Sequence, residues 1–443
     1  MSALANILLS QKKSVSGSDA KQSAISERLR ERGALICYRQ DGSSLRRGQT
    51  VVYSTAIKKD NLEWKACQEL NLETIHRSEL LERLMGEKKQ LIVAGAHGKT
   101  SVTSLLSYVL EIAQLDPCYA IGGYCLSLES NGRWGQGEYF VAEGDESDGS
   151  FLKTRPFAAI VNNIDVDHLG YYWKSYEDLL EAFKKFITQV ELPELCIYNA
   201  DDPCLKKWAP EGISFGFSPS ADIRIERLCE EGEMMQFDLI EETKVLSHVK
   251  LSMIGRHNVL NAAAVYALAS RLGIQEEVIR EAFQTFKGIE RRMEVKSQTQ
   301  NIFVIDDYAH HPREILETVI ALERAFPLKR VVKVFQPHRF TRVCSLLDEF
   351  VDALAQIEEN LIVTDIYSAG ESSEGWITTQ AFLNALEKRA EFQYVPRESL
   401  GAYLVKIATP GDIVLLMGAG DITEESRFLA EQLNKENEPI PAC

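Results

Sequence analysis

The chain has 443 residues, a formal net charge of −16 at pH 7 and 45% hydrophobic residues. This length predicts more than one domain, and the apolar content is sufficient to build buried cores. Because the acidic residues are spread along the chain and not gathered in a tail, the charge argues against nonspecific binding to nucleic acid. No stretch approaches the roughly 18 unbroken apolar residues that a membrane span needs.

The N-terminal residues MSALANILLSQKK lack the pattern of a secretory signal, because the lysines follow the apolar run and no small-residue cleavage site comes next. Nine cysteines are scattered without a C-x-x-C pair, which argues against a disulfide framework and against a zinc site. We therefore expect a soluble cytoplasmic protein with no membrane or nucleic-acid partner.

Strand-like runs alternate with helix-like runs almost throughout the chain. The apolar, β-branched runs lie at residues 50–55, 90–95, 139–144, 157–164, 194–199, 301–308, 330–335, 360–367 and 412–420. Buried runs of this kind, separated by amphipathic segments, are typical of parallel sheets covered by helices. The expected fold class is therefore α/β.

Two changes of pattern divide the chain. The charged stretch GEKKQ separates a first α/β segment from the strand before a glycine turn. Short alternating strands are expected from Ala221 to Leu251 and a helical pair from Asn258 to Phe286, after which strand and helix alternate again from about Arg292–Lys296. We expect three domains, at residues 1–86, 87–293 and 294–443.

The glycine turn GAHGKTS, residues 95–101, joins a strand to a helix. Glycines there let backbone N–H groups and the helix dipole face a polyphosphate, which Lys99 would also reach, while the Thr100 hydroxyl would bind Mg²⁺. The strict G-x-x-x-x-G-K-[ST] pattern is not met, because Val93 stands where its first glycine belongs. The alternative is a tight turn with a solvated lysine.

Acidic residues follow the next strand, in VAEGDESDGSF, which carries Glu143, Asp145, Glu146 and Asp148. Carboxylates this close repel one another unless a cation or water screens them. The stretch NNIDVDHLG ends another strand, and in a parallel sheet these strand ends face the same crevice. Glu143 and His168 are therefore candidates to converge on a metal, with a solvated loop and a structural histidine as the alternatives.

Four further stretches end strands or begin helices. YNADDP (198–203) and GRHNVLNAAA (255–264) offer amides and carboxylates for an adenine edge or ribose, although taken alone helix capping explains them better. DDYAHHP (306–312) and FQPHRFTR (335–342) follow strands, and the second places Arg339 and Arg342 three residues apart. On a helix such a pair can bind a carboxylate or a phosphate, and the alternative is two surface arginines.

Together these stretches resemble the Mur ligase family of peptidoglycan synthesis. The resemblance covers essentially the whole chain and follows the family's order, through VSGSD, VVYSTAIKKDN, GAHGKTS, AEGDESDGSF, NNIDVDHLG, NADDP, HNVLNAAA, GIERR, DDYAHHP, FQPHRFTR, IYSAGE and GAGDI. It implies a Rossmann-like N-terminal domain that binds a UDP-sugar, a central P-loop-type ATPase domain and a Rossmann-like C-terminal domain.

The resemblance also implies roles for individual residues, with ATP and Mg²⁺ as cofactors. Metal binding falls to Thr100, Glu143 and His168, and catalysis to Lys99, Glu143, His168, His310, Arg339 and Arg342. Cofactor binding falls to Gly95, Ala96, His97, Gly98, Lys99, Thr100, Ser101, Asn258, Asn261, Arg292, Asp307 and Tyr308. Asn258 and Asn261 correspond to the adenine side, and the arginines to the amino-acid end.

Within the family, the motifs are most similar to members that join L-alanine to UDP-N-acetylmuramate. This implies that the muramate carboxylate attacks the γ-phosphate of ATP, and that the alanine amine then attacks the acyl phosphate. Two alternatives stay open: a related ligase that adds a peptide, and a nucleotide-binding protein without ligase activity. We expect a monomer or a weak homodimer.

Three positions depart from the family pattern. Gly144 replaces a usual alanine in the acidic motif, and Gly170 stands where an aspartate commonly follows DHL, which affects the support of His168. In the family a strand and a glycine-rich turn come before MSALA. We therefore expect a translation start roughly 10–15 residues upstream, the length of one strand of about five residues and a glycine turn.

Overall fold

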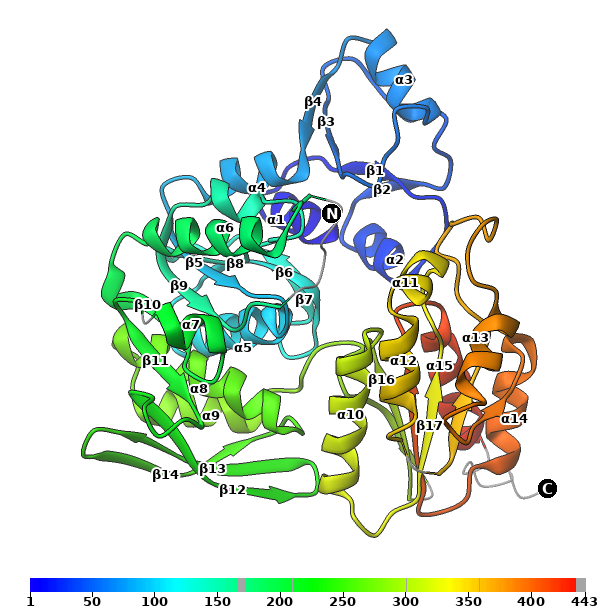
Figure 1. Cartoon of the computed structure of the whole chain (residues 1–443). Coiled ribbons are helices and arrows are strands. Elements are labelled where there is room, and N and C mark those ends of the chain that lie inside the picture. Colours follow the sequence, from blue (N-terminus) through cyan, green and yellow to red (C-terminus); the bar gives the residue numbers. More distant parts are fainter. Residues whose placement is uncertain (166–171, 209, 300, 358, 436–443) are drawn as a thin grey trace, which may run out of the picture. The chain divides into compact units, whose positions relative to one another are not determined.

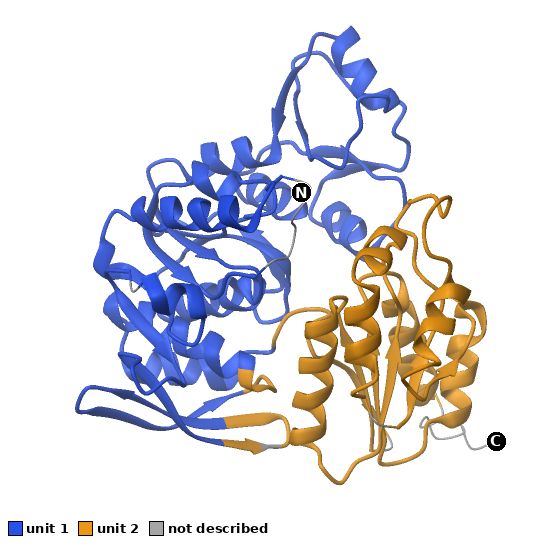
Figure 2. Cartoon of the chain, in the orientation of Figure 1, with its two compact units in different colours: residues 1–228, 236–251, 257–287 blue, residues 229–235, 252–256, 288–443 orange. Residues whose placement is uncertain are grey.

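The computed structural model describes residues 1–165, 172–208, 210–299, 301–357 and 359–435. It is a mixed α/β protein whose chain forms two compact units (Figure 2). Unit 1 contains residues 1–228, 236–251 and 257–287, and unit 2 contains residues 229–235, 252–256 and 288–443. Within the described residues, no helix combines the length and the apolar character needed to cross a membrane.

The N-terminal segment contributes two small parallel sheets to unit 1. β1 pairs with β2 and β3 pairs with β4, and each pair forms a separate sheet (Figure 1). The elements are α1 (Ser2–Ser10), β1 (Ser16–Ser18), α2 (Ala24–Glu31), β2 (Leu35–Cys37), β3 (Thr50–Tyr53), α3 (Leu62–Glu69), β4 (Glu73–His76) and α4 (Arg77–Met85).

Helices α1 and α4 of this segment pack into the core of the central sheet. Ile7 of α1 and Met85 of α4 are almost fully buried in one cluster with Phe140 and Phe151. Removing such apolar area from water is the main stabilising term of the contact. Because α4 is fixed in this way, its first residue is held at a defined place against the central sheet.

A ten-stranded sheet forms the centre of unit 1, in the order β14-β13-β12-β11-β10-β9-β5-β8-β6-β7 (Figure 1). Its strands are β5 (Lys89–Ala94), β6 (Cys118–Cys125), β7 (Ser130–Arg133), β8 (Tyr139–Glu143), β9 (Pro156–Val161), β10 (Cys196–Asn199), β11 (Ile213–Gly216), β12 (Ile223–Glu231), β13 (Met234–Glu241) and β14 (Lys244–Leu251). The helices and 3₁₀ turns are α5 (Lys99–Ile112), η1 (Ser150–Lys153), α6 (Tyr176–Thr188), η2 (Pro193–Leu195), α7 (Pro203–Trp208), α8 (Arg256–Arg271) and α9 (Glu276–Thr285).

The position of β5 in this sheet determines where the site forms. β5 is parallel to both of its neighbours, β8 and β9. The carboxyl ends of parallel neighbours meet at one edge of a sheet. The glycine turn after β5, the acidic loop after β8 and the asparagines after β9 therefore lie together.

Unit 2 contains a six-stranded sheet in the order β15-β16-β20-β17-β18-β19, in which only the β15–β16 pairing is antiparallel. Its elements are β15 (Glu294–Thr299), β16 (Ile302–Asp307), α10 (Pro312–Ala325), β17 (Val331–Phe335), α11 (Phe340–Ser345), α12 (Leu347–Leu354), β18 (Leu361–Val363), α13 (Thr379–Leu386), β19 (Gln393–Tyr394), η3 (Arg397–Ser399), α14 (Leu400–Ile407), β20 (Ile413–Met417) and α15 (Ile422–Lys435). Two separate hydrophobic clusters, one around Phe335 and one around Leu416, cover the sheet.

The nine strands expected from apolar runs are confirmed as β3, β5, β8, β9, β10, β16, β17, β18 and β20. The short strands expected before residue 251 are β12 to β14, and the helical pair is α8 and α9. Strands β6 and β7 were not expected, because their sequences CYAIGGYC and SNGR carry glycines that normally weaken a strand. The domain boundaries at 86/87 and 293/294 stay predictions.

Candidate active site

The glycine turn after β5 adopts a backbone that requires glycine. Gly95 and Gly98 have φ values of 136° and 80°, which side chains disfavour. A Cβ on Gly98 would also lie 2.8 Å from Asn162 Nδ2 and from Asn261 Oδ1. The two amides therefore press against the turn, and glycine permits this close approach.

The asparagines after β9 hold the turn through its backbone. The His97 N–H donates to Asn163 Oδ1 at 2.8 Å, and the Asn162 amide donates to the His97 carbonyl at 3.2 Å. Helix α5 then begins at Lys99 with no side-chain cap from Gly98. Its first N–H groups, those of Lys99, Thr100 and Ser101, are therefore of the kind that binds an anion.

Lys99 is not a solvated lysine. Its Nζ donates to the Gly95 and Ala96 carbonyls and lies 2.9 Å from Glu146 Oε2. The side chains of Lys99 and Glu146 are only 16% and 3% exposed. Burial raises the pKa of Glu146, although Lys99 opposes this shift. The alternative of a solvated lysine in a tight turn is therefore wrong. Lys99 belongs to a polar network at the strand ends.

Thr100 and Glu143 form an oxygen-rich pair beside Lys99. The Thr100 hydroxyl donates to Glu143 Oε2 at 3.2 Å, and the Gly122 N–H donates to Glu143 Oε1 at 2.6 Å. A Cβ on Gly122 would lie 2.8 Å from Glu143 Oε1, so this glycine of β6 makes room for the carboxylate. Hydroxyl and carboxylate oxygens are hard donors of the type that Mg²⁺ prefers.

The residues therefore fit a magnesium ion whose remaining ligands would be phosphate and water oxygens. Within the described ranges, no group of three or more His, Cys, Asp or Glu side chains could hold a metal by itself. Mg²⁺ usually takes only one or two protein carboxylates together with substrate phosphates, so such a cluster is not required. His168, the third predicted ligand, lies outside the described residues, and its pairing with Glu143 stays a prediction.

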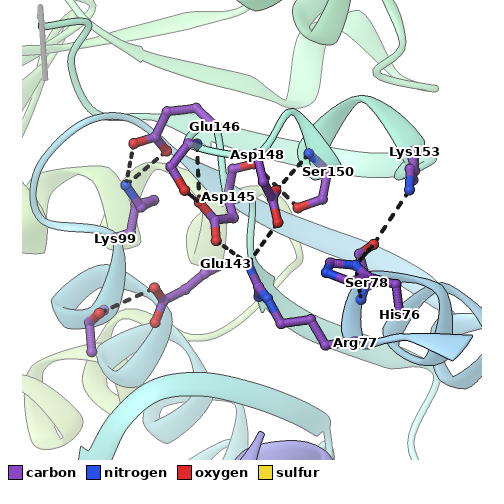
Figure 3. A network of polar contacts seen from close by, with 12 residues as sticks. His76, Arg77, Ser78, Lys99, Glu143, Asp145, Glu146, Asp148, Ser150 and Lys153 are labelled. Atoms are coloured by element: carbon purple, nitrogen blue, oxygen red, sulfur yellow. Dashed lines mark hydrogen bonds and ion pairs between the residues drawn. The ribbon is translucent and has the colours of Figure 1, made fainter. Parts of the chain in front are cut away.

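The acidic loop is held by cations and is not a freely solvated loop (Figure 3). Arg77, the first residue of α4, forms ion pairs with Asp145 and Asp148. Burial acts to raise the pKa of Asp145, but hydrogen bonding from Ser147 and the Arg77 charge outweigh it, so the pKa lies below its usual value. The network brings Arg77 into contact with the loop that carries Glu143.

The asparagines of the predicted adenine side lie on α8. Asn258 and Asn261 are both buried, and the Asn261 amide donates to Asn258 Oδ1 at 3.2 Å. Asn261 also faces Gly98, so α8 reaches the phosphate loop. In YNADDP, by contrast, Asp202 accepts from the N–H groups of Cys204 and Leu205 at the start of α7, which is the capping alternative.

In unit 2, the predicted residues after β16 form a second cluster. Asp307 is buried and accepts from the N–H groups of Met293 and Ala309 at 2.7 and 2.8 Å. Burial raises its pKa to about 6 against the opposing charge of Arg292. The Arg292 guanidinium lies 5.2 Å from the centre of the Tyr308 ring, within the range of a cation–π contact.

His310 and His338 are neutral at physiological pH. Burial lowers the pKa of His310 to about 4, although Glu314 opposes the shift. Burial and the neighbouring Arg342 lower the pKa of His338 to about 3. Arg342 donates to His338 Nδ1 at 3.0 Å, and the His338 ring stacks on Tyr367 with 5.7 Å between centroids.

Arg339 and Arg342 lie at the start of α11. Arg342 is within the helix, and Arg339 is its N-cap with an unusual φ of 68°. A positive φ is costly for a residue with a side chain and persists only where the surroundings enforce it. Here the Arg339 N–H donates to the Tyr367 carbonyl at 2.8 Å. The strained backbone belongs to an arginine that is exposed as a residue.

Sequence reasoning missed several members of these clusters. Arg77 stands in HRSELLERL, which reads as an ordinary helix start and gives no signal of a distant partner. Asn162 and Asn163 were within a quoted motif but were not singled out, and neither was His338. The strand-end position of these three residues is the signal that could have found them.

Three family models match the chain in order. The Mur ligase family catalytic domain matches residues 1–89, and the Mur ligase middle domain matches residues 93–269. The third, described as Mur ligase, glutamate ligase domain, matches residues 291–420. The phosphate loop, the acidic loop and the two asparagines of α8 lie in the second range, and the unit 2 cluster lies in the third.

Three similar proteins share one activity in their names. UDP-N-acetylmuramate–L-alanine ligases from Protochlamydia amoebophila and Desulforapulum autotrophicum are 41% and 39% identical, over 96% and 98% of this chain and 94% and 96% of those proteins. The solved UDP-N-acetylmuramate–alanine ligase of Thermotoga maritima is 27% identical with a TM-score of 0.85, covering 99% of this chain and 97% of that one. The solved murein peptide ligase of Psychrobacter arcticus shares the fold, with 22% identity and a TM-score of 0.71. That match covers 99% of this chain and 97% of the other chain.

Proposed function

Because this chain belongs to the Mur ligase family, we propose that it joins L-alanine to the carboxylate of UDP-N-acetylmuramate with ATP, in peptidoglycan synthesis. The relatives that carry this activity in their names match nearly the full length of the chain. The observation that carries the proposal is the group of Lys99, Thr100 and Glu143 at adjoining strand ends. At this place the glycine turn suited to phosphate, the ammonium group of Lys99, and the Thr100 and Glu143 oxygens suited to Mg²⁺ lie together.

The chain's own groups in unit 1 are suited to phosphoryl transfer. The uncapped N–H groups at the start of α5 bind the phosphates of ATP, and Lys99 neutralises charge on the transferring group. Asn258 and Asn261 are proposed to face the adenine side. Thr100, Glu143 and His168 are proposed to hold Mg²⁺, which when bound screens the phosphate charge that would repel the muramate carboxylate. The product of this half-reaction is an acyl phosphate.

The groups in unit 2 are suited to the second half-reaction. Arg339 and Arg342 are proposed to bind the carboxylate of L-alanine, since guanidinium groups pair well with carboxylates. His310 Nδ1 lies 2.9 Å from the Tyr308 carbonyl, so Nδ1 carries the proton in the neutral ring. Its Nε2 is then able to accept a hydrogen bond from the alanine nitrogen, which orients that nitrogen toward the acyl carbon.

The decisive assay measures phosphate release from ATP with each substrate omitted in turn. We expect release only when UDP-N-acetylmuramate and L-alanine are both present. Release that requires a peptide in place of L-alanine would identify a recycling-type ligase. ATP binding with no release under either condition would identify a nucleotide-binding protein without ligase activity. We further propose a cytoplasmic enzyme that is a monomer or a weak homodimer, which sedimentation tests.

A further inference from the structure

The acidic loop after β8 concentrates negative charge at the phosphate site. Four of its six residues from Glu143 to Asp148 are carboxylates. Carboxylates at such separations repel one another, so the loop needs cations to keep one shape. The structure places Lys99 against Glu146, and Arg77 against both Asp145 and Asp148 (Figure 3). Lys99 comes from the phosphate loop itself, whereas Arg77 comes from the N-terminal segment.

Arg77 binds the loop through oxygens that the loop does not use for its own folding. Oδ1 of Asp145 accepts from the N–H and hydroxyl of Ser147, at 3.1 and 2.6 Å. Oδ1 of Asp148 accepts from the N–H of Ser150 at 3.0 Å. Arg77 Nη2 contacts Oδ2 of both aspartates. Each aspartate therefore closes a local turn with one oxygen and is tied to Arg77 by the other.

The support of Arg77 is rigid. It is the first residue of α4, whose far end carries Leu84 and Met85 in the central core. The loop is also held by Trp173, whose indole donates to the Glu146 carbonyl at 2.8 Å in a buried contact. A side chain held by a packed helix can fix the position of a loop, because its own movement would disturb the core.

We propose that Arg77 is a positioning residue for phosphoryl transfer, which holds the acidic loop so that Glu143 and Glu146 face Thr100 and Lys99. Arg77 acts through the loop and is not itself a catalytic residue. The proposal rests on the function proposed above. It places a determinant of magnesium and nucleotide binding outside the central segment, at the first residue after the β3–β4 sheet.

The test compares four variants of the full chain. Arg77→Ala removes the bridge, and Arg77→Lys keeps one charged nitrogen that can contact both carboxylates, as Nη2 of Arg77 does. The triple variant Arg77→Ala, Asp145→Asn, Asp148→Asn removes the repulsion while each asparagine Oδ1 can still close its turn. Arg83→Ala is the matched control, because Arg83 of the same helix also pairs with two carboxylates, Glu73 and Glu79, but at an exposed position.

The readouts are the affinity for MgADP by calorimetry, the Mg²⁺ concentration for half-maximal phosphate release, and the KM for L-alanine. For Arg77→Ala we expect MgADP affinity to fall by about tenfold or more, as when groups that orient metal ligands are lost, with the alanine KM within about twofold of wild type. Arg77→Lys and the triple variant should recover most of the affinity, and Arg83→Ala should match wild type.

If Arg77→Ala lowers the thermal midpoint but leaves the MgADP affinity unchanged, the proposal is overturned. Arg77 would then have a structural role only. Failure of both the lysine and the triple variant to bind more tightly than Arg77→Ala would also overturn it. If Arg77→Ala does not fold, these two variants still test the idea, because loss of affinity in a folded triple variant contradicts it. A wild-type protein that binds MgADP but releases no phosphate would refute the ligase function and leave the calorimetric comparison valid.

Discussion

The ammonium group of Lys99 lies 2.9 Å from Oε2 of Glu146, a carboxylate that is 3% exposed. The two charges depend on each other, because a buried carboxylate without a cation is strongly destabilising. A solvated lysine would contribute little to folding, so its removal would leave the fold intact. This structure predicts a different result, in which Lys99 serves both the phosphates and the stability of the acidic loop.

Replacing Lys99 by Ala should therefore lower activity by more than 10²-fold and also destabilise the protein by about 2 kcal/mol. The loss of activity follows from the missing charge at the transferring phosphate, and the loss of stability from the unpaired Glu146. Phosphate release and the thermal midpoint measure the two effects. The double variant Lys99→Ala, Glu146→Gln is the control, and it should regain stability without regaining activity. Activity within about tenfold of wild type in Lys99→Ala would refute the phosphate-loop assignment.

Changing Glu143 to Gln should raise the Mg²⁺ requirement and lower the rate, while UDP-sugar binding stays unchanged. The amide oxygen can still accept from the Gly122 N–H, and the Thr100 hydroxyl can rotate to accept from the new NH₂ group. The shape of the site is thus kept and only the charge is lost. Titration of Mg²⁺ against phosphate release checks this prediction. A curve identical to that of wild type would show that Glu143 does not bind the metal.

Much of the fold was predictable because buried parallel strands read as continuous apolar runs. The phosphate and acidic loops were predictable for a related reason, since parallel strand ends converge whatever the intervening sequence is. Strand β6 was missed because its glycines look like a turn, although Gly122 donates its N–H to Glu143 and leaves room for that carboxylate. The prediction of strands from local sequence patterns therefore failed at a residue that contacts the site, where function and not strand propensity determines the amino acid.

The role of Arg77 could not be predicted from the sequence. It is separated from Asp145 by 68 positions, and the pairing depends on how α4 packs into the central core. No periodicity or motif encodes such a contact in a single sequence. The same holds for the neutral state of His310 and His338, because burial sets their pKa values and burial is known only after folding.

Arg339 and Arg342 are predicted to bind the amino acid and not the nucleotide. Changing either to Ala should raise the KM for L-alanine by about tenfold or more, the value of a lost charge-assisted hydrogen bond, while ATP affinity measured by calorimetry is kept. Arg339→Gly is a useful companion, because glycine relieves the φ of 68° that alanine would keep. Equal KM values for the Gly and Ala variants would assign the effect to the guanidinium. Lost ATP affinity with a normal alanine KM would show that the arginines bind a different ligand.

Acid should destabilise the protein through His310. Its pKa is about 4 in the folded protein and about 6.5 in an unfolded chain, so between these values the unfolded state binds more protons and stability falls as pH falls. The loss from this one group is about 2 kcal/mol at pH 5 relative to pH 7. Asp307 acts in the opposite direction, because its folded pKa of about 6 lies above its usual value and the folded state gains a proton first.

The variant His310→Gln isolates the histidine contribution, since glutamine can donate to the Tyr308 carbonyl but does not titrate. The difference between the thermal midpoints at pH 7 and pH 5 should be smaller in this variant than in wild type. Asp307 titrates in both proteins, so its effect cancels in the comparison, whereas His338, whose ring centroid lies 6.1 Å from that of His310, also loses the His310 charge that lowers its pKa. An unchanged pH difference would mean that folding does not lower the pKa of His310, and it would contradict this prediction.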